Sequence, residues 1–181
     1  TYFQALSPAT LLASQEDKYL NLKNSLPSMM SLHEKYTSTP QMQVFEGKEG
    51  LIQIWNDTLN ATTDLLCWAD IDNTADYCKE YGPEYVKKRV GKNIWVRAIY
   101  NDSPLAEYQK TISDQELREI YTVPKEKFPF DNEINIYDDK VSIISHHDEI
   151  GVIIQNKAIA DTQRSIFKFG FEYAKLLAES T

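Results

Sequence analysis

A tryptophan and an aspartate at the end of a short apolar run are the side chains best suited to bind a small molecule. The run spans Leu65–Ala69, includes Trp68, and is followed by Asp70. Such a run is typical of a buried parallel strand, and open α/β sheets bind ligands beyond the carboxyl ends of their strands. There, Trp68 could stack on a sugar or a base while Asp70 accepts its hydrogen bonds. The alternative is that Trp68 belongs to the core, as we expect for Trp55 and Trp95.

The segment His146–Glu149 is the other polar cluster with chemical potential. Adjacent residues on a strand point to opposite faces, so His146 and His147 do not converge on one metal ion, and we interpret the segment as a polar hairpin turn. The chain has three histidines and two cysteines without CxxC or HxxxH spacing, which predicts neither a metal site nor a cofactor. Cys67 and Cys78 cannot make a disulfide framework, and Cys67 is expected to be a buried hydrophobe. The GxSxG and glycine-rich phosphate motifs do not occur.

The charge balance argues against nucleic-acid binding by this part of the chain. Among 181 residues, 19 basic and 27 acidic side chains give a net charge of −8, whereas phosphate binding needs a positive patch. The run Lys87-Lys88-Arg89 is interpreted as the basic end of a helix, which complements the helix dipole. No apolar run approaches the roughly 18 to 20 residues that span a bilayer, and no signal peptide is recognisable. We therefore expect a cytoplasmic protein without a membrane partner.

The first 36 residues carry a helical pattern with a short heptad seam. Two series recur at every seventh position and interleave like the a and d positions of a coiled coil: Leu12, Tyr19, Leu26 and His33, with Gln15, Leu22, Met29 and Tyr36. Pro27 should kink or restart this helix. The helix either packs on its own domain or pairs between two chains. In the second case Leu12, Tyr19, Leu22, Leu26 and Met29 would form the dimer contact. Because the chain starts at Thr1, we expect a fragment whose N-terminal part is missing.

From Pro40 onward the pattern changes to alternating strands and helices. Strands are expected over residues 42–46, 65–69, 94–100, 134–137, 141–145 and 150–154, with a tight turn at 138–140. Helices should begin at Gly47, near Asp72, at Gly82, after Ser103 and after Asn156, with a shorter helix over residues 113–119. Hairpin-linked strands cannot all be parallel. The prediction is an α/β layered domain with a mixed sheet over residues 39–181, preceded by a helical linker over residues 1–38.

Several blocks of the sequence resemble the effector domain of TrmB-type transcriptional regulators of archaea and bacteria. The blocks are Leu26-Pro27, Val44–Leu51, Pro83–Arg89, Ile94–Ile99, Glu133–Val141, Gly151–Ile154 and Ile159–Phe167. They occur in order and together span essentially residues 2–178. The resemblance implies a full-length regulator that binds DNA through a winged helix-turn-helix absent from this sequence. It also implies a homodimer formed through the helix that links the two domains.

The same resemblance implies an effector domain with a fold like that of phospholipase D. Enzymes of that class carry a His-x-Lys-x₄-Asp motif, in which the histidine attacks phosphorus and the lysine binds the phosphate. When Asp138 is placed on the aspartate of that motif, Asp131 falls on the histidine and Glu133 on the lysine. Acidic groups at these positions cannot attack a phosphodiester or attract its charge. We therefore expect a protein that is not an enzyme.

A pocket-bearing fold without its catalyst predicts a sensor for a small-molecule effector, such as a sugar or another metabolite. The residues expected to bind that effector are Trp68, Asp70, Glu133 and Asn135. Two alternatives stay open. One is a dimerisation scaffold without a ligand, and the other is a residual phosphodiesterase-type hydrolase, which rests on fold analogy alone.

Overall fold

The computed structural model describes residues 7–35 and 41–180, and the chain divides into two units, residues 1–39 and 40–181. Helix α1 (Pro8–Lys35) lies in the first unit and is continuous through Pro27, so the expected restart there does not occur. Leu12, Tyr19, Leu22, Leu26 and Met29, the expected dimer contacts, are 49% to 63% exposed in the single chain. Of the other seam positions, Tyr36 and the side chain of His33 lie outside the described residues.

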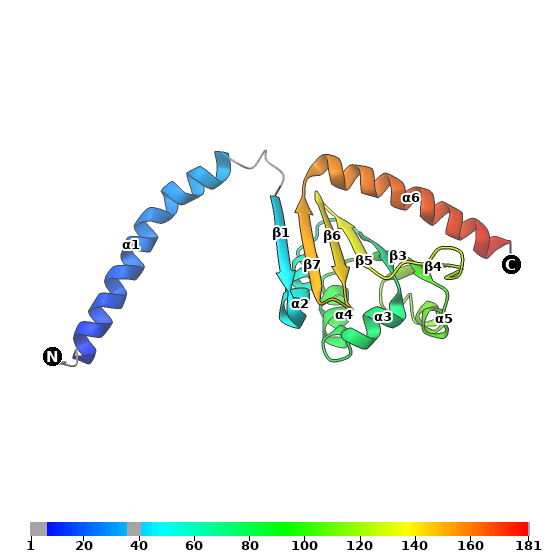
Figure 1. The fold of residues 1–181 in the computed structure, drawn as a ribbon, viewed down its shortest axis with the longest axis horizontal. Coiled ribbons are helices and arrows are strands. Elements are labelled where there is room, and N and C mark those ends of the chain that lie inside the picture. The colour runs from blue at the N-terminus through cyan, green and yellow to red at the C-terminus, as the bar shows by residue number, and fades with distance from the viewer. Residues whose placement is uncertain (1–6, 36–40, 181) are drawn as a thin grey trace. The chain divides into compact units, whose positions relative to one another are not determined.

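The second unit is built on one mixed sheet of seven strands among the described residues (Figure 1). The strands are β1 (Gln41–Glu46), β2 (Leu65–Ala69), β3 (Val96–Asn101), β4 (Arg118–Val123), β5 (Glu133–Tyr137), β6 (Lys140–Ser145) and β7 (Ile150–Gln155). Their order across the sheet is β1-β7-β6-β5-β2-β3-β4. Strands β2, β3 and β4 are parallel, and all other neighbouring pairs are antiparallel. The predicted mixed α/β architecture and the β5–β6 hairpin are confirmed.

Helices cover both faces of this sheet (Figure 1). Helix α6 (Lys157–Glu179) packs on one face, and its start is capped by Asn156, as predicted. On the other face lie α2 (Gly47–Thr58), α3 (Ile71–Tyr77), α4 (Gly82–Gly91) and α5 (Pro104–Thr111). Within the described part of the chain, none of the helices is long and apolar enough to cross a membrane.

The alternation of side chains along the central strands determines which residues pack on each face of the sheet. In β2, Leu66 and Trp68 point to α6, whereas Leu65, Cys67 and Ala69 join the core on the other face. In β5, Ile134 and Ile136 point to α6, whereas Tyr137 belongs to the opposite core. Glu133 and Asn135 share the alternation of Tyr137. Two polar side chains therefore enter the layer between the sheet and helices α2–α4.

Two expectations about local structure are wrong. The expected helix over residues 113–119 is instead a turn that leads into β4, whose residues pair in parallel with β3 from Val96–Arg118 onward. The β-branched and aromatic residues at positions 120–123 suit this strand, and the polar Ser113 and Asp114 belong to the turn before it. The cap of α3 is Asp70 and not the Asp72 segment, because the Asp70 carboxylate accepts hydrogen bonds from the backbone N–H groups of Asp72 and Asn73.

Arg89 lies in the last turn of α4, as predicted for the basic helix end, but its burial was not predicted. Its side chain is fully buried, and its guanidinium donates hydrogen bonds to the carbonyl oxygens of Ile94, Glu116 and Leu117. Burial, followed by the neighbouring Arg118 charge, lowers the pKa of Arg89. The Arg89 side chain thus connects the end of α4 to the residues just before β3 and β4. This connection holds α4 against the face of the sheet that borders the polar layer.

Candidate functional site

A buried carboxylate lies at the centre of the polar layer. Glu133 is 7% exposed and accepts hydrogen bonds from three side chains on three segments. Its Oε1 accepts from Trp55 Nε1 of α2 at 3.1 Å and from Asn135 Nδ2 of β5 at 2.6 Å. Its Oε2 lies 3.0 Å from Nε2 of His146, which follows β6 directly. Three donors from separate elements therefore meet one anionic group.

The strand register explains this convergence. Glu133 and Asn135 are two residues apart on β5 and so point to the same face. Glu133 is paired with Ile144 on β6, and the Ile144 side chain packs on the same face of the sheet, against α2. His146, two residues beyond Ile144, continues that alternation and reaches Glu133. Trp55 is held above both by the packing of α2 on Ile144 and Ile153.

The donors keep the carboxylate ionised. Burial by itself raises the pKa of Glu133, but the hydrogen bond and charge of His146, with the hydrogen bonds of Asn135 and Trp55, outweigh it and leave the pKa below its ordinary value. An ionised carboxylate can only accept hydrogen bonds, so Nε2 of His146 carries a proton. The second ring nitrogen of His146, Nδ1, lies 4.0 Å from the Sγ atom of Cys78.

Aromatic rings enclose the imidazole of His146, which is only 1% exposed. The Tyr77 ring stacks on it with centroids 6.1 Å apart, and Trp55 meets it edge-on at 6.0 Å. Tyr85 packs against Trp55 with a centroid distance of 5.3 Å and shares a hydrogen bond with Thr58. These rings exclude water from the hydrogen bond between His146 and Glu133, which strengthens that bond.

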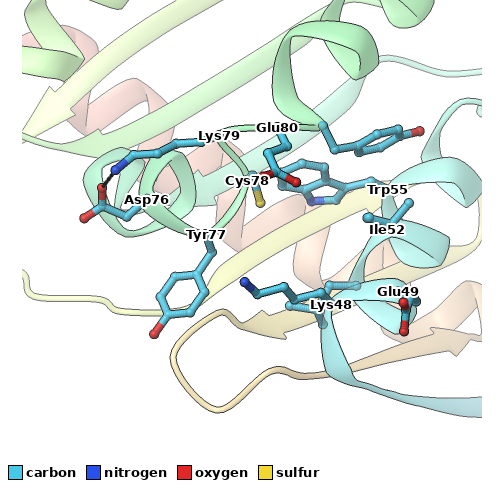
Figure 2. A pocket seen from close by; sticks show the side chains of 11 residues that line it. Lys48, Glu49, Ile52, Trp55, Asp76, Tyr77, Cys78, Lys79 and Glu80 are labelled. Atoms are coloured by element: carbon cyan, nitrogen blue, oxygen red, sulfur yellow. Dashed lines mark ion pairs between the residues drawn. The ribbon is translucent and has the colours of Figure 1, made fainter.

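A cavity of about 410 Å³ opens beside this hydrogen-bonded network, between α2 and the segment that joins α3 to α4 (Figure 2). Its apolar walls are Leu51, Ile52, Trp55, Tyr77 and Tyr81, and charged side chains of both signs line the rest: Lys48, Glu49, Asp76, Lys79 and Glu80. The Cys78 side chain also faces the cavity. Such a volume is in the range of small-molecule sites. Because Trp55 lines the cavity and donates to Glu133, anything that moves its indole also disturbs the buried network.

The structure brings together two of the four residues predicted from the sequence to bind a ligand. Glu133 and Asn135 are hydrogen-bonded neighbours. Trp68 lies on the opposite face of the sheet, where Phe130 and Phe167 meet its ring edge-on. Asp70 is buried as the cap of α3 and pairs with Lys125, its Oδ2 lying 2.6 Å from Nζ. The four residues therefore do not form a single cluster.

Three residues of the site escaped the sequence analysis: Trp55, Cys78 and His146. The predicted hairpin turn over His146–Glu149 is confirmed between β6 and β7, but His146 within it is buried, whereas His147 is exposed beside Asp148. The usable signal was the inward alternation of Ile144 and His146, together with the need of a buried Glu133 for a hydrogen-bond donor. Among the residues that the structure describes, no group of three or more histidine, cysteine, aspartate or glutamate side chains is arranged to hold a metal ion.

Comparison with known proteins adds the fold but not the chemistry. No protein-family model matches the sequence, and no curated protein sequence matches it either. Among solved structures, the chain is similar to TrmBL2, an archaeal chromatin protein described as showing a novel mode of DNA binding. The TM-score is 0.54 at 16% identity, over 94% of this chain and 71% of that one. It is also similar to NucT from Helicobacter pylori, with a TM-score of 0.52 at 13% identity, over 74% of this chain and 96% of that one.

We predict that the two adjacent histidines differ sharply in their contribution to stability. His146→Ala leaves the buried, ionised Glu133 without one of its three hydrogen-bond donors, which should lower the free energy of unfolding by about 3 kcal/mol. His147→Ala changes a side chain that is 89% exposed and should alter it by less than about 0.5 kcal/mol. Urea denaturation followed by circular dichroism measures both values. Equal effects of the two substitutions would contradict the buried hydrogen bond between His146 and Glu133.

Proposed function

We propose that this chain is the effector-sensing and dimerisation domain of a TrmB-type transcriptional regulator, whose DNA contacts are made by another part of the protein. The observation that carries the proposal is the fold likeness to TrmBL2 over 94% of this chain. That span is too long to be supplied by the α/β unit alone, so it includes part of α1. The relation to the phospholipase D fold, suggested by the sequence blocks, belongs to the same proposal.

The sensing half of the proposal is supported by the cavity and its connection to the core. A ligand that contacts the Trp55 ring would act on a side chain that also donates to Glu133. Glu133 is in turn hydrogen-bonded to Asn135 on β5 and to His146, the residue that follows β6. A ligand shifts a conformational equilibrium only if it binds the two conformations with different affinities. The Glu133 network could supply two such conformations, which would differ in their hydrogen-bond partners. We place the effector in this cavity and not at Trp68.

The dimerisation half is supported by α1. Five apolar side chains at heptad spacing are about half exposed or more in the single chain, and pairing of two α1 helices would bury them. The net charge of −8 makes the α/β unit itself a poor partner for DNA. In the full regulator, the geometry of the paired helices would set the spacing between two DNA-binding domains.

We also propose that the domain does not hydrolyse phosphodiesters. The carboxylate of Glu133 occupies the position at which the related enzymes need a phosphate-binding lysine. Its pKa is held below the ordinary value by its donors, so the group is negative at neutral pH and repels a phosphate. His146, the nearest imidazole, is already bonded through Nε2 to this carboxylate.

We predict that the chain is a dimer held together through α1. Size-exclusion chromatography with light scattering should give twice the 20.9 kDa monomer mass, and Leu22→Glu should shift the protein to the monomer because it places charges in the apolar seam. The matched control is Asn21→Glu, which adds the same charge one position outside the seam and should leave the dimer intact. A monomeric wild-type protein, or equal effects of the two variants, would contradict the proposal.

We predict that an effector of this domain requires the indole of Trp55. In a thermal-shift screen of sugars, nucleotides and amino acids, a ligand at 100 times its dissociation constant should add about 2.7 kcal/mol to stability. Trp55→Phe should abolish that shift. The control is Trp68→Phe, which alters a tryptophan on the opposite face and should retain it. Loss of the shift in Trp68→Phe alone would move the binding site to that face, and no shift with any ligand would favour the scaffold alternative.

A further inference from the structure

Three side chains beside the cavity lie in an order that serves nucleophilic chemistry. Cys78 Sγ lies 4.0 Å from His146 Nδ1, and His146 Nε2 lies 3.0 Å from Glu133 Oε2. We propose that Cys78 is a nucleophilic thiol which His146 activates, and that it forms covalent adducts with small α,β-unsaturated carbonyl compounds that enter the cavity.

The tautomer of His146 makes it suited to act as a base. Glu133 accepts a hydrogen bond from the Nε2–H group, so in the neutral ring the lone pair is on Nδ1, which faces the thiol. Glu133 also holds the ring in place and stabilises the imidazolium that forms after proton transfer. A nucleophile, a base and an orienting carboxylate in this order are the general arrangement for activating a weak nucleophile.

Activation by a base is needed because the Cys78 thiol does not ionise readily by itself. Burial, followed by the negative charge of Glu133, raises the pKa of this thiol well above its ordinary value. The proton therefore has to leave during the attack. It moves from Sγ to Nδ1 of His146, while the sulfur forms a bond to the β-carbon of the ligand. The electron pair of the carbon–carbon double bond moves to the carbonyl oxygen, and the imidazolium then returns the proton to the α-carbon. No oxidant or reductant is consumed.

The cavity fits this class of ligand. The rings of Trp55, Tyr77 and Tyr81 line it together with Cys78, and flat aromatic walls suit planar conjugated molecules. Cys67, on β2, is buried in the core and does not line the cavity. The chain thus contains its own reference thiol.

This chemistry requires only Cys78, His146 and Glu133. A role for the Cys78 adduct as the signal sensed by the domain rests on the proposed sensing function. The reactivity of the thiol is measured separately from dimerisation and from the ligand-induced thermal shift, so failure of one does not decide the other.

The experiment measures the reaction of each cysteine with N-ethylmaleimide at pH 7, followed by mass spectrometry of the peptides. Folding normally protects a partly buried thiol. We expect the opposite for Cys78, which should react at least as fast in the folded protein as in the urea-unfolded protein. Cys67 should be strongly protected by folding. Protection of Cys78 to the same degree as Cys67 would overturn the proposal, and this comparison needs no substitution.

Two variants in a Cys67→Ala background test the role of the base. His146→Gln keeps a hydrogen-bond donor for Glu133 but removes the base, and Glu133→Gln can donate to Nε2 and so shift the ring proton to Nδ1. Each should slow the reaction of Cys78 by a factor of about 10 or more, since general bases typically contribute 10²–10⁴. Circular dichroism establishes that the variants are folded. An unchanged rate in a folded variant would show that Cys78 is merely accessible, which contradicts the proposal.

Discussion

The ionised carboxylate of Glu133 is the constraint on which the packing of the sheet against helices α2–α4 depends. Removing an ion from water has a penalty of several kcal/mol unless hydrogen bonds replace the solvent. Trp55, Asn135 and His146 supply those bonds from α2, from β5 and from the residue that follows β6. The three segments must therefore be placed correctly relative to one another before the charge is tolerated. This requirement explains why polar residues occupy a layer that is otherwise aromatic and aliphatic.

The same requirement shapes the site available for function. The carboxylate draws the Nε2–H group of His146 toward itself and leaves Nδ1 facing Cys78 and the cavity wall. We propose that small-molecule recognition occurs at the cavity and that subunits pair through α1. The indole of Trp55 lines the cavity and donates to Glu133, so it would connect a bound ligand to the sheet.

Local patterns in the sequence were sufficient to predict most strands and the caps of α5 and α6. The run Leu65–Ala69 and the hairpin around Asp138 were recognised because alternation and turn residues are local signals. Strand β4 was missed because its identity comes from pairing with β3 and because Ser113 and Asp114 resemble helix caps. The burial of Arg89 was not predicted because its partners, three backbone carbonyl groups, come from segments that follow it in the chain.

The candidate site was predicted only in part, for a similar reason. The resemblance to TrmB-type regulators selected Glu133 and Asn135, which the structure places together. Alternation put Trp68 on one face of β2, but a strand pattern does not reveal which helices cover that face, and here it is α6. The burial of His146 follows from Glu133, thirteen positions away, and from rings on α2 and α3. Such a pair is specified by the tertiary structure and not by spacing.

The most direct test of the central claim is the protonation of the His146 ring, observed by nitrogen-15 NMR of the imidazole at pH 8. If Glu133 is an ionised acceptor at the centre of the network, Nε2 should carry a slowly exchanging proton, and Nδ1 should be unprotonated. The exposed His147, next in the chain, should show rapid exchange at both nitrogens and so provides the internal reference. A proton on Nδ1 with a bare Nε2 would mean that Glu133 is protonated and donates to the ring. That result would contradict the account.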